Sequence, residues 1–123
     1  MRKLLMVVSV VALGAVGCGG EEEEGAVPEV NCDAGVPIPT FSEVAVFEEC
    51  SKCHSKLLTG NARMKAPTDI NFDDYASAVA HARKATSEVN GGDMPPPDAP
   101  GFPEPTEQEK QQLYLWALCG TPQ

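Results

Sequence analysis

Five consecutive residues constrain this chain more than any other part of it: Cys50, Ser51, Lys52, Cys53 and His54. Two thiols three positions apart lie on one helical turn, so both can add to the vinyl groups of a single porphyrin. The histidine that follows brings an imidazole nitrogen within reach of the iron from the same side. This C-x-x-C-H spacing is the attachment motif for c-type haem, and it predicts one covalently bound haem.

Two other chemistries use such a cysteine pair. A zinc site needs two more N or S ligands, and beyond the leader the chain offers only Cys32, Cys119 and His81, with no second C-x-x-C. A thioredoxin-like dithiol belongs to a βαβ context, which the flanking sequence does not provide. Haem attachment is therefore favoured over both alternatives.

The first residues have the composition of an export signal. Arg2 and Lys3 precede a short apolar run from Leu4 to Ala15. Such a run is too short to span a bilayer and has the length of a signal-peptide core. We therefore expect residues 1–17 to be a signal peptide.

The run ends in Ala15-Val16-Gly17-Cys18, which resembles the lipobox of bacterial lipoproteins. The resemblance implies that Cys18 becomes the lipid-modified first residue of the mature protein. Several acyl chains on this residue would hold the protein stably to a membrane. Gly19, rather than Asp, follows Cys18, which implies the outer membrane, and we expect the periplasmic face of the cell envelope. The alternative is an ordinary cleaved signal in which Cys18 has no role.

The chain has 5 cysteines. With Cys18 assigned to lipid and the motif pair to haem, Cys32 and Cys119 remain. Because export leads to an oxidising compartment, we predict that these two form a disulfide that ties the ends of the domain together. The alternative is a pair of buried free thiols.

A chain of 123 residues leaves room for one small domain after the leader. Residues 18–39 are rich in Gly, Glu and Pro without helical or strand periodicity, which predicts an anchor followed by a disordered, extended linker. We expect the domain to occupy residues 40–123. A covalent porphyrin would supply apolar interior that so small a domain lacks.

The charge is strongly acidic. The whole chain carries −9, and removal of Arg2 and Lys3 with the leader leaves 7 basic and 18 acidic residues, a net −11. Such a surface excludes nucleic acid as a partner. It is suited to solubility and to electrostatic steering towards a basic redox partner protein.

Helical spacing predicts an all-α domain of about three helices. The first begins at Thr40 and the third at Thr106, because each threonine has a glutamate three positions later, Glu43 and Glu109, to complete a capping box. The second spans about 73–89, with Asp73 or Asp74 as its cap and Gly91 as its stop. The expected apolar faces are Val44, Phe47 and Cys50; Tyr75, Val79, Ala82 and Val89; and Leu113, Trp116 and Ala117.

A second iron ligand is expected after the second helix. Met94 stands between Gly91-Gly92 and three prolines, which hold it on a stiff, presented loop. Its thioether is a soft ligand suited to haem iron, paired with His54. Met64 and His81 are the alternatives for the sixth position.

The order of helix, C-x-x-C-H, loop, helix, Met-Pro-Pro loop and tryptophan-bearing last helix resembles a small class I cytochrome c over residues 41–120. Ala66-Pro67, Asn71-Phe72-Asp73 and residues 116–120 more narrowly resemble the small lipoprotein cytochromes of myxobacteria-like organisms. The aromatic residue that meets the last helix in this family stands four positions before the first cysteine. This chain has Val46 there, with Phe47 next.

The resemblance implies a fold of helices packed around the haem and a role for each site residue. Cys50 and Cys53 form the thioethers, and His54 and Met94 are the proximal and distal ligands. The carbonyl of Pro67 accepts the ring N–H of His54.

The resemblance also implies an electron carrier and not an enzyme, with outer-sphere transfer to redox partner proteins and no small-molecule substrate. The alternative is a haem protein with an open sixth position, acting as a gas sensor or as a redox enzyme subunit.

Overall fold

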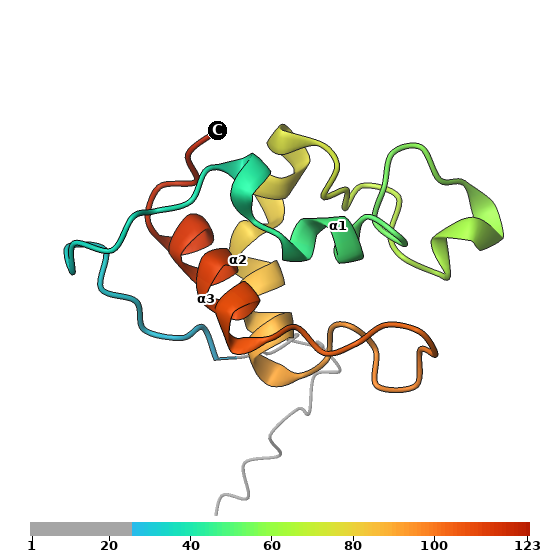
Figure 1. The fold of residues 1–123 in the computed structure, drawn as a ribbon. Helices are drawn as coiled ribbons and strands as arrows, with labels where there is room; N and C mark the ends of the chain where they lie inside the picture. The colour runs from blue at the N-terminus through green and yellow to red at the C-terminus, as the bar shows by residue number, and fades with distance from the viewer. Residues whose placement is uncertain (1–25) are drawn as a thin grey trace, which may run out of the picture.

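The computed structural model describes residues 26–123. This part of the chain has three α-helices, two short 3₁₀ helices and no strand, which confirms the all-α prediction for it. The elements are η1 (Phe41–Glu43), α1 (Val46–Cys50), η2 (Gly60–Arg63), α2 (Tyr75–Gly91) and α3 (Glu107–Leu118). α3 packs against both α2 and α1 (Figure 1). The predicted signal peptide and Cys18 lie outside the described residues.

Both predicted capping boxes are present. The backbone N–H of Thr40 donates to Glu43 Oε2 at 2.7 Å at the start of η1. At the start of α3, the N–H of Thr106 donates to Glu109 Oε2 at 2.7 Å, and Thr106 Oγ1 accepts from the Glu109 N–H at 3.3 Å. These reciprocal bonds satisfy helix-end donors that would otherwise lack partners, so they fix where the helices begin.

The single first helix expected from Thr40 onward is wrong, because the chain breaks at Val44. Val44 adopts φ −79° and ψ 90°, which separates η1 from α1. Val44, Val46 and Phe47 are all buried. In a continuous helix, positions 44 and 46 point about 200° apart, so one of them would face solvent. The break places both in the core.

The second helix lies two residues later than predicted, over Tyr75–Gly91. Asp74 is its cap, accepting from the Ser77 N–H at 3.0 Å, while Asp73 binds the segment after the motif instead. Gly92, and not Gly91, ends the helix in the left-handed conformation at φ 80°.

The core is a cluster of aromatic rings over a face of small side chains. Phe47 meets the fully buried Trp116 edge to face at 5.0 Å and stacks on Phe72 at 5.3 Å. Phe47 thus makes the aromatic contact between α1 and α3. The cytochrome resemblance expects that contact one position earlier, where this chain has Val46. The buried face of α2 consists of Ala78, Ala82, Thr86, Ser87 and Val89. Val79, expected on this face, is 37% exposed and was assigned wrongly.

Cys32 and Cys119 form a disulfide; their Cα atoms are 5.5 Å apart, and the two residues are separated by 87 in sequence. The described part of the expected linker, residues 26–39, contains no helix but is attached to the domain. Besides the disulfide, the Asn90 side chain donates to the carbonyl of Ala26 at 2.8 Å. Residues 26–39 are therefore tied to the domain at Ala26 and Cys32, where a free linker was expected. In Figure 1 they loop out on the left, away from residues 51–63.

No helix within residues 26–123 combines the length and the apolar character that crossing a bilayer requires.

Candidate cofactor site

The C-x-x-C-H motif forms one tight turn at the end of α1. Cys50 is the last residue of that helix. Its carbonyl accepts from the N–H of Cys53 at 3.2 Å and from that of His54 at 2.8 Å. Neither motif cysteine is in a disulfide. Two thiols and an imidazole are therefore held within a single turn.

The His54 ring is fixed on one side. Its Nδ1 lies 3.3 Å from the carbonyl oxygen of Ile70, and the ring makes a T-shaped contact with that of Phe72, with centroids 5.6 Å apart. The backbone is held as well, because the His54 carbonyl accepts from the Phe72 N–H at 2.8 Å. A carbonyl only accepts, so Nδ1 carries the proton and the lone pair stays on Nε2, the atom available to a metal.

Burial lowers the pKa of His54, and the charges of Arg63 and His81 lower it further, against the opposing hydrogen bond to Ile70. The ring is therefore neutral at pH 7, which is the state that binds iron. Burial likewise raises the pKa of the Cys50 thiol to about 12, with a smaller contribution from the charge of Glu49.

The zinc alternative loses its remaining sulfur ligands. Cys32 and Cys119 are bonded to each other and supply no thiolate. The motif pair and His54 would still need one more N or S ligand for a structural zinc site, and within residues 26–123 no three or more His, Cys, Asp or Glu side chains are grouped so as to hold a metal ion. The residues present fit a haem better, because the two unpaired thiols and the neutral imidazole match its two thioethers and its proximal ligand.

The expected role of Pro67 is wrong. The carbonyl facing His54 belongs to Ile70, three residues later. The Pro67 carbonyl accepts from the guanidinium of Arg63. Arg63 itself is only 3% exposed. The Arg63 side chain thus binds the Pro67 and Ile70 carbonyls together, and of these two Ile70 is the one that His54 contacts.

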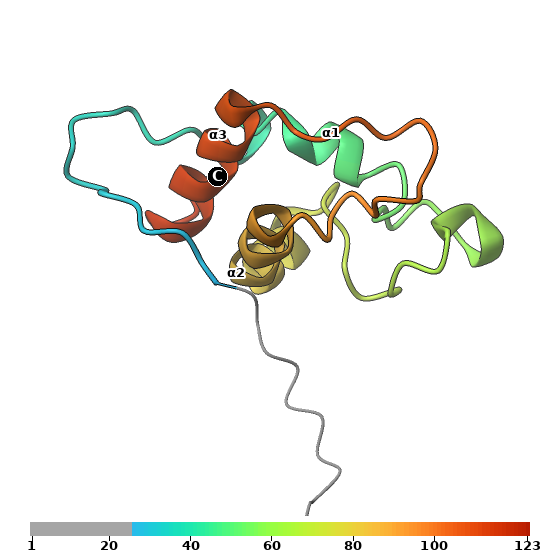
Figure 2. The same ribbon diagram turned by 90° about the horizontal axis from the view of Figure 1, so that it is seen from below.

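The segment that carries Met94 is anchored at its start. The N–H groups of Asp93 and Met94 both donate to the Glu88 carbonyl, at 2.9 and 3.2 Å. The Met94 side chain is partly buried against the hydrophobic core. Figures 1 and 2 both show residues 92–105 at the same end of the molecule as residues 51–63.

The two alternative ligands have different surroundings. Met64 is 51% exposed, and its sulfur lies 3.5 Å from the Cys53 sulfur. Its backbone is in the left-handed region at φ 50°. His81 is half-buried on α2.

Asp73 ties the turn after His54 to the start of α2. Its carboxylate accepts from Ser55 Oγ at 2.6 Å and from the Lys56 N–H at 3.0 Å. Burial raises the pKa of Asp73, but these hydrogen bonds lower it by more, and the net effect is a pKa below the usual value. The charged carboxylate is thus the form that holds this connection.

We expect the stability of the domain to fall in acid partly through Asp73. A carboxyl whose pKa is lower in the folded state stabilises the protein above its unfolded pKa of about 3.9, and this contribution is lost as pH falls through the folded value. The Asp73→Asn variant should therefore show a weaker decline in unfolding free energy between about pH 5 and pH 2. Denaturant titrations across that range measure it. Glu48→Gln, at an exposed position of α1, is the control, and an unchanged pH dependence in Asp73→Asn contradicts the prediction.

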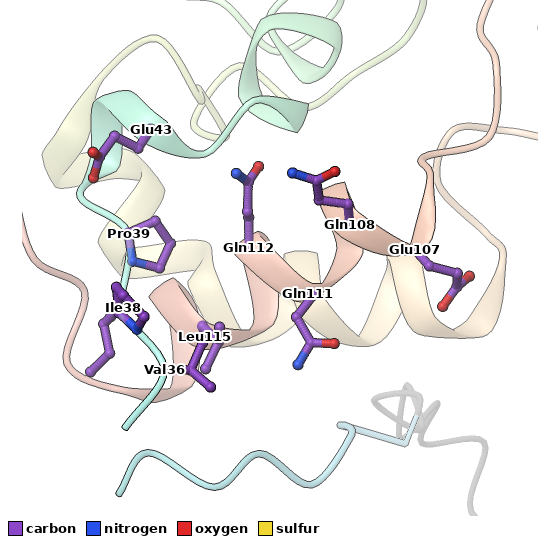
Figure 3. Close-up of a pocket in the computed structure, with 10 residues that line it drawn as sticks. Val36, Ile38, Pro39, Glu43, Glu107, Gln108, Gln111, Gln112 and Leu115 are labelled. Atoms are coloured by element: carbon purple, nitrogen blue, oxygen red, sulfur yellow. The ribbon is translucent and has the colours of Figure 1, made fainter. Parts of the chain in front are cut away.

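A surface pocket of about 550 Å³ lies elsewhere, between residues 36–39 and α3 (Figure 3). Val36, Ile38 and Leu115 supply apolar walls, and the amides of Gln108, Gln111 and Gln112 lie along α3. None of the predicted site residues lines this pocket. It is therefore separate from the candidate site.

Comparisons of the chain with protein-family models, with curated proteins and with solved structures give no match. The interpretation of the site therefore depends on its own residues. These are two unpaired thiols and a neutral imidazole in one turn, with Nδ1 already bound to a carbonyl.

Proposed function

We propose that this chain is a small class I cytochrome c, an electron carrier with one covalently attached haem. Cys50 and Cys53 would form the thioethers, and His54 and Met94 would be the axial ligands. The observation that carries the proposal is the motif turn, in which both thiols are unpaired and the half-buried His54 keeps Nε2 available.

A bound haem supplies an iron that alternates between the ferric and ferrous states. The chain's own residues determine how well this works. Ile70 and Phe72 hold the His54 ring in one orientation, so the ligand does not need to rearrange when the charge changes. The buried rings of Phe47 and Phe72 stack on each other and would give the haem an apolar surface next to the motif. A soft, neutral Met94 sulfur favours the ferrous state.

The proposal extends to partners and location. The acidic chain, at −9, is suited to a redox protein with a basic docking surface, towards which it would be steered. Attachment to the outer membrane through lipid on Cys18 belongs to the same proposal, although Cys18 lies outside the described residues. Electrons would pass between proteins, with no small-molecule substrate.

Acid–acetone extraction of the exported protein tests the central claim. The haem should stay on the polypeptide, and the intact mass should equal the chain from residue 18 plus one haem and the lipid. The Cys53→Ala variant should lose one of the two thioethers, whereas Cys32→Ser, which removes a cysteine outside the motif, should keep both. Haem that is extracted from the wild-type protein would falsify the proposal, and a mass without lipid removes the anchoring part alone.

A further inference from the structure

Arg63 is a charged side chain that is almost fully buried, 3% exposed, at the end of η2. Burial of a cation is costly unless hydrogen-bond acceptors surround it. The guanidinium of Arg63 donates to five acceptors, all of them neutral: the carbonyls of Ser55, Ala66, Pro67 and Ile70 and the side-chain oxygen of Asn71. The positive charge is thus solvated by oxygen dipoles and not cancelled by them.

Two of these acceptors adjoin His54. Ser55 directly follows it in the chain, and Ile70 faces its ring. The Ile70 carbonyl is shared, because Arg63 Nη2 lies 3.0 Å from it and His54 Nδ1 lies 3.3 Å from it. A carbonyl whose electrons are drawn towards a guanidinium is a weaker acceptor for a second donor.

The strength of the bond to the ring N–H governs how strongly an imidazole donates to a metal on its other nitrogen. A strong acceptor gives the ring imidazolate character, which stabilises ferric iron. By competing for Ile70, Arg63 weakens that acceptor. Its uncancelled charge also disfavours the extra positive charge of ferric iron. Both effects act in the same direction.

We infer that Arg63 is a positioning residue that acts through the Ile70 carbonyl to limit electron donation by His54 and so keeps the reduction potential of the haem high. This inference rests on the proposed function. It assigns a role to a residue that is not a ligand and that the motif does not include.

The test compares Arg63→Met with Arg63→Lys in the haem-containing protein. Arg83→Met, which removes an exposed arginine from α2, is the matched control. At a fixed ambient potential, Arg63→Met should raise the ratio of oxidised to reduced protein by on the order of tenfold. This is the lower end of the losses in metal affinity or activity caused by mutating groups that orient metal-binding histidines. Arg63→Lys keeps the positive charge but not the planar guanidinium with its several N–H donors, so its shift in this ratio should be smaller. Arg83→Met should match the wild-type protein.

A second measurement separates this role from simple support of the loop. In the reduced, diamagnetic protein, the NMR resonance of the His54 Nδ1 proton should move downfield in Arg63→Met, because its bond to Ile70 becomes stronger. Loop support alone lowers thermal stability but moves neither this resonance nor the potential. A variant with the wild-type resonance and potential overturns the inference.

If the Arg63→Met variant cannot be obtained with haem attached, the Asn71→Asp variant tests the inference instead. It places a carboxylate where the amide oxygen now accepts from Arg63 Nη1 at 3.0 Å, so the charge is cancelled while the arginine stays. The potential should fall in this variant, and an unchanged potential overturns the inference. A wild-type protein without covalent haem is a different result, which removes the proposed function itself.

Discussion

Met94→Ala should open the sixth coordination position of the haem in the proposed cytochrome. Because alanine has no donor atom, the weak sulfur-to-iron absorption near the red end of the oxidised spectrum should vanish and carbon monoxide should bind the reduced form. Met94→His should instead keep the iron low-spin and lower the potential by on the order of tenths of a volt, a part of the roughly 0.8 V that axial ligands span. Optical spectra and redox titration measure all of these.

The exposed Met64 provides the control, since it differs from Met94 in surroundings but not in chemistry. Met64→Ala should leave the spectrum unchanged. If the sulfur band is lost in Met64→Ala and kept in Met94→Ala, then Met64 is the ligand and the Met94 prediction is wrong. Unchanged spectra in both variants point to His81 as the sixth ligand, and carbon monoxide binding by the wild-type protein points to a gas sensor or a redox enzyme subunit.

Removal of the Cys32–Cys119 disulfide should cost a large part of the stability of the domain. The bond closes a loop of 87 positions, for which loop-closure entropy gives roughly 4–5 kcal/mol as an upper figure. Small domains have about 5–15 kcal/mol in total. The Cys32→Ser/Cys119→Ser double variant should therefore unfold at much lower denaturant concentration, with its haem still attached.

Reduction of the wild-type protein should reproduce the loss, since the thioethers are not disulfides and survive a thiol reductant. Denaturant titration followed by tryptophan fluorescence reports the change, because Trp116 is the chain's only tryptophan and is fully buried. Equal unfolding free energies for the double variant and the wild-type protein contradict the prediction.

The sequence predicts those parts of the fold whose causes are local. Thr40 and Thr106 mark helix starts because their capping partners stand three residues away, and both are found in the structure. The break at Val44 could not be predicted, since it depends on how three apolar residues share one core. Val79 was misplaced for a related reason: helical periodicity allows several faces, and the packing of α3 selects the one with small side chains.

The candidate site shows the same division. The spacing of Cys50, Cys53 and His54 places them in one turn because a turn is local. The contacts of His54 and of Arg63 with Ile70 could not be predicted this way, because both are made to a backbone carbonyl, and carbonyls are the same in every residue. The sequence around Arg63 gives no sign that this arginine is buried, because an arginine shortly before Ala66-Pro67 could equally be exposed on the surface.

The disulfide also determines how the molecule carries mechanical load. A pull between the chain before Cys32 and the chain after Cys119 passes directly through the sulfur bridge. The intervening residues, which include all three α-helices and the motif turn, form a covalent ring that this force bypasses. Tension on the residues before Cys32 is therefore transmitted to Cys119, at the end of α3, without passing along the chain between the two cysteines.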